Sequence, residues 1–261
     1  MAIIDDTYNP GISWPTFLTE YQISFTEEEE RVLEKYNDPE LAKAHNAYRE
    51  GVNNGDVPVR NFEILWLSHN IVARQDEFKS LRETFFELAY HYLSEVYQFE
   101  VPDEFELAIC DSWILHLRGN ELMPSDREYE PFRRHNHSFA MLSGILYLDD
   151  SDNGLKIEEP DSTDSPFFPI IFDKKPDRNN YAGGKYFECR RGKVIMLPGK
   201  VFHELVQNNN QHDFRRSLIF NLWPTGVVSR RDSGLLLAED INNGHSMSMA
   251  EYMEKNNGRE R

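Results

Sequence analysis

Apolar residues spaced three and four positions apart predict the clearest helix of the chain. The residues with this spacing are Phe78, Leu81, Phe85, Leu88, Tyr92 and Val96. Asp76 lies in position to cap this helix. A second helix is expected over 26–36, because Thr26 and Glu29 match a capping box and acidic residues follow the cap. These patterns predict that residues 1–105 are mainly helical.

Beyond Pro102 the pattern changes to short apolar or alternating runs, separated by Gly, Pro, Asn and Asp. These runs predict strands at 106–118, 140–148, 167–172, 185–189, 193–197, 202–207 and 215–223. A turn is expected at Asp152–Asn153–Gly154. Seven short strands without long helices between them indicate an all-β sandwich or barrel.

The two patterns divide the chain into regions of one structural domain. We expect the helices of 1–105 to pack on a β-core formed by residues 106–225. Residues 226–261 are a C-terminal extension that includes a short polar helix. Because no stretch has the composition of a linker, the regions are not expected to separate.

Charge and composition change the picture by disfavouring several classes of function. The 261 residues include 28 Lys and Arg against 45 Asp and Glu, which gives a net charge of −17. Basic residues are scattered among acidic ones, so we expect no nucleic-acid partner. Aromatic residues make up 13%, which favours a folded core over disorder. With no apolar run suited to a signal peptide or a membrane span, we expect a cytoplasmic protein whose two cysteines are reduced.

Three histidines are spaced as a metal site requires. His135 and His137 flank one residue, so in an extended segment their side chains point to the same side. His203 follows a strand and a Pro-Gly turn 66 residues later. An HxH pair alone is a weak signal, since such a pair is often structural. Three protein ligands would leave coordination positions open for a substrate.

A second polar group follows on one strand. In 215–223, alternation puts Arg215, Ser217 and Asn221 on one face and Arg216 on the other. A guanidinium and a hydroxyl presented together suit a carboxylate, because Arg forms two parallel charged hydrogen bonds with it.

These blocks resemble the iron(II)- and 2-oxoglutarate-dependent oxygenases, and among them a group of bacterial and phage-type hydroxylases. The matching blocks are His135-Asn-His137, Leu142-Ser-Gly-Ile-Leu-Tyr-Leu148 with Gly154, Gly192-Lys-Val-Ile-Met-Leu-Pro198 with His203, and Arg215-Arg-Ser217-Leu-Ile-Phe-Asn221. The resemblance covers about 107–223. It implies an α+β fold, with a double-stranded β-helix (jelly-roll or cupin-like) barrel and a helical N-terminal layer.

The resemblance also implies roles for individual residues and two cofactors, iron(II) and 2-oxoglutarate. His135, His137 and His203 would hold the metal at the catalytic centre. Arg215 and Ser217 would bind the distal carboxylate of 2-oxoglutarate. Tyr147 and Asn221 complete the expected cosubstrate site. The resemblance names neither the substrate nor the oligomeric state.

His137 departs from the usual pattern of the superfamily, which has a carboxylate at this position. Either three imidazoles bind the metal, or one of the pair is not a ligand and a water or a remote acid replaces it. Three imidazoles would make metal affinity fall as the pH drops through about 6.5. Two other functions stay open. These are a non-catalytic β-sandwich with a structural histidine cluster, and a cupin-like metalloenzyme that uses no 2-oxoglutarate.

Overall fold

The structure is a computed structural model of the chain. It describes residues 3–4, 9–13, 16–36, 64–67, 70–117, 135–137, 140–157, 185–205, 215–227, 236–237 and 246–256. The strands are β1 Ile3–Ile4, β2 Asn9–Ser13, β3 Thr16–Ser24, β4 Ile64–Leu67, β5 Glu106–Leu117, β6 Leu142–Tyr147, β7 Ser151–Ile157, β8 Lys185–Cys189, β9 Lys193–Pro198, β10 His203–Leu205, β11 Arg215–Val227, β12 Leu236–Leu237 and β13 Ser246–Ser248. The helices are α1 Glu27–Lys35, α3 Ile71–Arg74, η1 Asp76–Phe78, α4 Lys79–His91, η2 Tyr92–Val96 and α5 Met249–Asn256.

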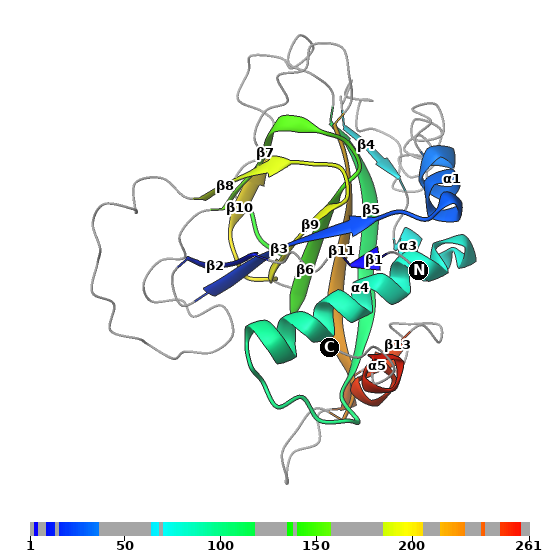
Figure 1. Ribbon diagram of the computed structural model, residues 1–261, viewed down its shortest axis with the longest axis vertical. Helices are drawn as coiled ribbons and strands as arrows, with labels where there is room; N and C mark the ends of the chain where they lie inside the picture. The colour runs from blue at the N-terminus through cyan, green and yellow to red at the C-terminus, as the bar shows by residue number, and fades with distance from the viewer. Residues whose placement is uncertain are drawn as a thin grey trace, which may run out of the picture.

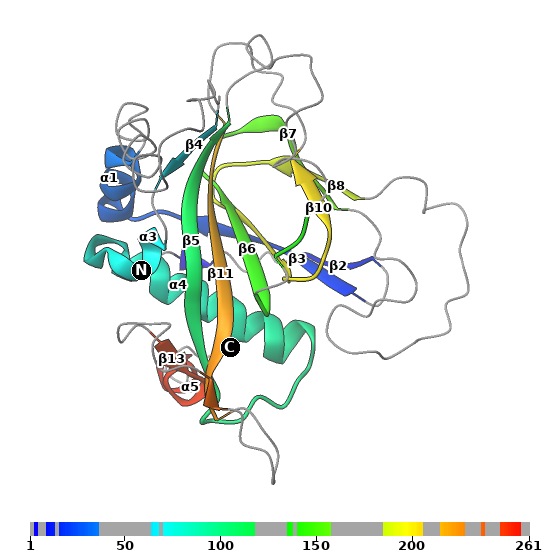
Figure 2. The ribbon, with the colours of Figure 1, turned by 180° about the vertical axis from the view of Figure 1, so that it is seen from behind.

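The described residues form two antiparallel sheets. The larger sheet has the strand order β1-β3-β9-β6-β11-β5-β13, with β2, β4 and β12 attached at its sides. The smaller sheet has the order β10-β7-β8. In both ribbon views, α1 and α3 lie on one side of β5 and β11, and the smaller sheet lies on the other (Figures 1 and 2). The described residues thus form a mixed α and β fold around a curled antiparallel sheet.

Alternation along the central strands builds two separate cores. Leu218 and Phe220 of β11 face the helices and pack with Phe85 of α4. Ile219, between them, faces the smaller sheet and packs with residues such as Phe187 of β8. One face of β11 therefore contributes to the layer against the helices, and the other lines the space between the two sheets.

Both long predicted helices are present. The capping box of α1 forms as expected, since the Glu29 amide donates to Thr26 Oγ1 and the Glu29 carboxylate accepts from the Thr26 amide. Glu29 also accepts from Ser80, which joins α1 to α4. Asp76 does not cap α4, because it begins the 3-10 turn η1. The N-cap of α4 is Phe78, without a side-chain hydrogen bond.

The first 24 residues differ from the helical region expected there. They contribute β1, β2 and β3, and β3 pairs with β9 inside the larger sheet. In β3, Tyr21 and Ile23 face the helices while Leu18 faces the space between the sheets. This alternation with period two is what makes the segment a strand. The expectation of a helical N-terminal layer is thus wrong for the described residues before α1.

The turn expected at Asp152–Gly154 is also wrong, because these residues lie within β7. The register between β7 and β8 shifts between Ser151 and Leu155, so a bulge accommodates the extra residues. Asp, Asn and Gly favour bulges and turns alike, so their presence alone did not distinguish the two. The expected strand at 167–172 lies outside the described residues.

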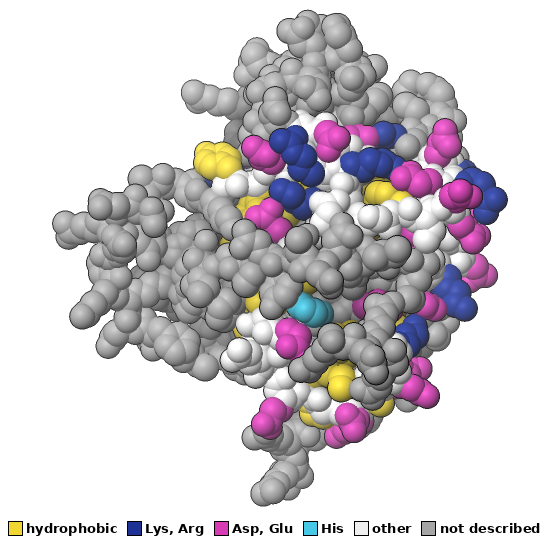
Figure 3. Space-filling model, in the orientation of Figure 1, with side chains coloured by type: hydrophobic (Ala, Val, Ile, Leu, Met, Phe, Trp, Pro, Cys, Tyr) yellow, Lys and Arg dark blue, Asp and Glu magenta, His cyan; other side chains and the backbone are white. Residues whose placement is uncertain are grey.

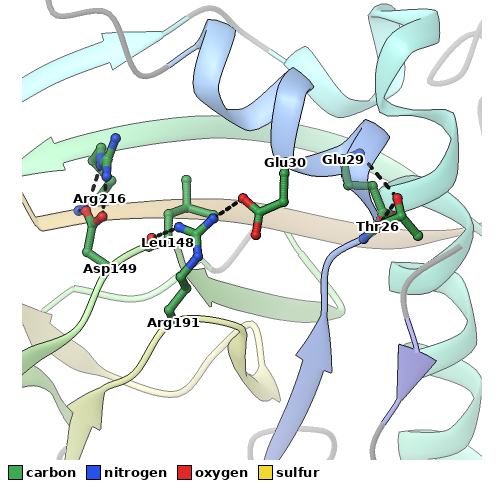
Figure 4. Close-up of polar contacts among 7 residues, drawn as sticks. All are labelled: Thr26, Glu29, Glu30, Leu148, Asp149, Arg191 and Arg216. Atoms are coloured by element: carbon green, nitrogen blue, oxygen red, sulfur yellow. Dashed lines mark hydrogen bonds and ion pairs between the residues drawn. The ribbon is translucent and has the colours of Figure 1, made fainter.

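Two arginines tie the strand ends together (Figure 4). Arg191 donates to the Leu148 carbonyl and to the carboxylate of Glu30 in α1. Arg216 binds both carboxylate oxygens of Asp149, and its Nε lies 2.7 Å from Oδ2. These half-buried contacts join α1 and the end of β6 to the turn between β8 and β9, which carries Arg191, and to β11, which carries Arg216.

The described surface mixes charges of both signs. On the face in Figure 3, Lys and Arg side chains alternate with Asp and Glu rather than forming one basic patch. Among the described residues, no helix combines the length and the apolar character needed to span a bilayer. Both cysteines are free thiols; Cys189 is buried and Cys110 is half-buried.

Gly144 in β6 is a sensitive point of the helix-facing core. A Cβ at this position would lie 2.0 Å from the Phe220 ring, which stacks on Phe85 with centroids 3.8 Å apart. The ring cannot move away, so Gly144→Ala should lower the free energy of unfolding by about 1–3 kcal/mol. Urea unfolding measures this change. In the background Phe220→Leu the added methyl should cost clearly less, and strict additivity of the two changes would contradict the account.

Candidate metal centre

The three histidines expected as ligands lie together. One ligand atom from each of His135, His137 and His203 can be chosen so that all lie within 4.8 Å of one another. His135 and His203 are held by a pair of backbone hydrogen bonds, 2.9 and 2.8 Å long, in which each amide donates to the other's carbonyl. This bridge brings the HxH segment to the start of β10 across 68 positions of sequence.

The Pro-Gly turn after β9 holds the backbone of His137 in place. The His137 amide donates to the Gly199 carbonyl at 2.7 Å. A Cβ on Gly199 would lie 2.1 Å from the Ala140 carbonyl oxygen and 2.7 Å from that of His137. Only glycine allows the turn to approach this closely. The sequence Pro198-Gly199 therefore positions His137 as well as His203.

Hydrogen bonds at Nδ1 orient the two buried rings. His203 Nδ1 lies 3.0 Å from the Val201 carbonyl, which can only accept. His137 Nδ1 lies 2.8 Å from Ser143 Oγ and 2.8 Å from Asn221 Oδ1. A proton on Nδ1 puts the lone pair of the ring on Nε2, which is the atom that a metal ion would bind.

Burial keeps these imidazoles neutral. His137 is 4% exposed and His203 2% exposed. Burial lowers the pKa of His137 to about 4, with a smaller opposing effect from the Asn221 hydrogen bond. Burial, assisted by the other two histidines, lowers the pKa of His203 to about 3. Protons should therefore compete with a metal for these two rings only near pH 3–4. The sequence alone led us to expect this competition at a pH of about 6.5.

The chemistry of the cluster fits a divalent transition metal. The group of candidate ligands contains three histidines and, within the described part of the chain, no Asp or Glu. Neutral imidazoles are common ligands of iron and zinc, and a cluster of three leaves coordination positions open. Of the alternatives left open by the sequence, the described residues offer the three-imidazole set and no replacing acid.

The residues expected to bind the cosubstrate lie on β11 and on its neighbour β6. Tyr147 of β6 is directly opposite Ser217 in the register, and both are buried. Arg215, two residues away on the same face, is 3% exposed, and burial lowers the pKa of its guanidinium. Arg216, on the opposite face, binds Asp149 instead. The predicted division of the two arginines between the faces is confirmed.

Some residues of this region were not identified from the sequence. Ser143 contacts His137, and its signal was a hydroxyl within the apolar run of β6. Trp113 of β5 lies with its ring centroid 5.6 Å from that of His137. Cys189 is buried beside Arg215, and burial raises the pKa of its thiol to about 12. Contacts of this kind depend on strand register, which the sequence pattern did not fix.

Structural similarity was found to several 2-oxoglutarate enzymes. The carbocyclase SnoK from nogalamycin biosynthesis is 10% identical, with 78% of each chain covered and a TM-score of 0.46. The epimerase SnoN from the same biosynthesis is 12% identical, with 71% of this chain and 73% of that chain covered and a TM-score of 0.42. A prolyl-4-hydroxylase from Pseudomonas putida is 16% identical, with 69% and 84% covered and a TM-score of 0.34.

A search of curated proteins found no match to the sequence. Residues 125–221 match the family model described as "Putative 2OG-Fe(II) oxygenase". The matched segment contains all three histidines and Arg215, Ser217 and Asn221 of β11. The description of the family names iron(II) and 2-oxoglutarate, the two cofactors expected from the sequence. Over these residues the chain is similar to that family of 2-oxoglutarate- and iron(II)-dependent oxygenases.

Proposed function

We propose that this protein is an iron(II)- and 2-oxoglutarate-dependent dioxygenase that hydroxylates a substrate, and that its curled sheet is the double-stranded β-helix of that superfamily. The observation that carries the proposal is that three buried or half-buried histidines each offer a ligand atom, and that these three atoms lie within 4.8 Å of one another. The family match covers the same residues. We expect the protein to act in the cytoplasm, with residues 106–225 as the oxygenase core.

In this proposal His135, His137 and His203 hold the iron. When bound with 2-oxoglutarate, the metal supplies the oxidising chemistry that inserts oxygen into a C–H bond. The protein keeps two of the rings neutral through burial and fixes their Nδ1 atoms through hydrogen bonds. Rings that are already deprotonated and oriented bind a metal without a further cost of rearrangement.

The distal carboxylate of 2-oxoglutarate would lie against Arg215 and Ser217. A guanidinium stays protonated, and in a buried position its attraction to a carboxylate is screened less than on the surface. The Tyr147 hydroxyl is buried and has no hydrogen-bond partner among the described residues, so it is available to donate to the same carboxylate. Ser217 and Asn221 are about 13 Å apart along β11, so the carboxylate and the metal would occupy different levels of one strand face.

One assay, succinate formation from 2-oxoglutarate, separates this proposal from both alternatives. A non-catalytic sandwich would form no succinate from 2-oxoglutarate whatever its metal content. A cupin-like enzyme would bind the metal but would not convert 2-oxoglutarate. Metal-dependent succinate formation, measured with a panel of candidate substrates or as slow turnover without substrate, supports the oxygenase.

Removal of one ligand should abolish tight metal binding. His203→Ala leaves two imidazoles, and we expect iron(II) affinity, measured by anaerobic calorimetry, to fall by at least two orders of magnitude. His91→Ala is the control, because His91 lies on α4 and contacts Tyr21 rather than the cluster. Unchanged affinity in the His203 variant would rule out the site.

Loss of the buried cation should affect 2-oxoglutarate rather than the metal. Breaking a buried charge pair commonly costs about 3–5 kcal/mol, so Arg215→Ala should raise the KM for 2-oxoglutarate by two orders of magnitude or more. Arg216→Ala is the matched control: it removes the ion pair with Asp149 and should lower stability without a comparable change in KM. Equal effects on KM would place the carboxylate elsewhere.

Metal binding should persist to a lower pH than it would with three histidines of ordinary pKa. The lowered pKa values of about 4 for His137 and about 3 for His203 mean that both rings are deprotonated above those values. Metal affinity should therefore lose its contribution from these rings only as the pH falls towards 4. Calorimetry with manganese(II) across the range tests this. A fall in manganese(II) affinity near pH 6.5 that corresponds to more than one proton taken up per metal released would contradict this expectation.

A further inference from the structure

We infer that Asn221 is a positioning residue for His137: its side-chain amide, helped by the Ser143 hydroxyl, holds the Nδ1-protonated form of the ring and so leaves Nε2 deprotonated, as a bound metal would require. This inference rests on the proposed function for its consequence. The contact itself is independent of whether a metal binds.

The two residues form a small cradle on paired strands. Asn221 of β11 and Ser143 of β6 are directly opposite each other in the register, and both side chains are completely buried. Asn221 Oδ1 and Ser143 Oγ each lie 2.8 Å from His137 Nδ1. Because cross-strand partners are fixed by the backbone, the cradle cannot shift without disturbing the central sheet.

The chemistry of the two oxygens gives Asn221 the deciding role. A carbonyl oxygen only accepts, so the Nδ1 that faces it must carry the proton. A hydroxyl can donate or accept, so Ser143 fits either form of the ring. With the amide reversed, its NH2 group would face Nδ1, and the proton would move to Nε2, where it would block a metal. The orientation of one amide therefore determines whether His137 can be a ligand.

A histidine needs such a device where a carboxylate does not. A carboxylate offers two equivalent oxygens, and either can bind a metal. An imidazole has two different nitrogens, and only the deprotonated one binds. His137 is such a ring, so it needs an acceptor at Nδ1 before Nε2 can bind a metal, and Asn221 provides that acceptor.

The neutral amide also sets the charge of the centre. A carboxylate at position 221 would accept from Nδ1 equally well but would add a negative charge behind the ring. Asn221 orients the ring without that charge, and the ligand group among the described residues contains no Asp or Glu. This difference makes Asn221→Asp a conservative variant for rescue and Asn221→Leu the disruptive one.

The first test reads the tautomer without any metal. In the full chain labelled with 15N-histidine, long-range 1H–15N correlations at neutral pH distinguish the Nδ1-protonated ring from the Nε2-protonated one. We expect the Nδ1-protonated form of His137 in the parent and in Asn221→Asp, and a mixture in Asn221→Leu. His203, whose Nδ1 faces the Val201 carbonyl, serves as an internal reference that should not change. The correlation that is absent from the spectrum of His137→Gln identifies the signal of His137.

The second test measures cobalt(II) affinity by anaerobic calorimetry. Loss of a contact that orients a ligand commonly lowers metal affinity 10–100-fold, and we expect a decrease of about this size in Asn221→Leu. Asn221→Asp should restore affinity to within a few-fold of the parent. Ser143→Ala should lose less than Asn221→Leu. Thr225→Val, buried on the same strand but facing Glu106, is the control and should bind as the parent does.

The outcomes separate the inference from the proposed function. An Nε2-protonated His137 in the parent overturns the inference, and this holds even if the leucine variant does not fold. Unchanged tautomer and cobalt affinity in Asn221→Leu also overturn it. If the parent has the expected tautomer but binds no cobalt, the proposed function fails while the Asn221–His137 contact stands.

Discussion

The antiparallel pairing of β6 with β11 is the contact on which the rest of the structure depends. Because side chains alternate, each residue pair of this ladder serves one of two layers. Gly144 and Phe220 face the helices, while Ser143 with Asn221 and Tyr147 with Ser217 face the space between the sheets. A slip by one residue would exchange these two sets. Packing against α4 therefore fixes the register, and the register fixes the candidate site.

Stability and chemistry are coupled through this ladder. The stacked rings of Phe85 and Phe220 fill the helix-facing core opposite Gly144, so Gly144 leaves room on β6 for the ring that packs against α4. On the reverse side of the same two strands, buried polar groups face each other. Buried polar groups weaken a fold unless they are hydrogen-bonded. The apolar layer supplies the stability that allows the inner face to carry Arg215, Tyr147 and the histidine cradle.

Local patterns predicted local features of this molecule well. The capping box of α1, the strands near 185–189 and 193–197, and the opposite faces of Arg215 and Arg216 follow from spacing alone. The nearness of His203 to the HxH pair also rested on the resemblance of several blocks, because spacing cannot bring distant residues together. The strands β1–β3 were missed because the helical patterns after Thr26 were extended to the start of the chain. The bulge in β7 was read as a turn because turns and bulges use the same residues.

The contacts that distinguish this centre from a simple set of ligands could not be read from the chain. Ser143 and Asn221 are 78 positions apart, and their meeting at one imidazole nitrogen depends on the exact pairing of two strands. Their effect is electrostatic as well as geometric. With neutral ligands and a neutral amide behind one of them, a bound dication would have no negative charge from the described ligands to balance it. A dianionic cosubstrate held by Arg215 would supply that charge beside the metal. In a buried site, where charges are screened weakly, each should then strengthen the binding of the other.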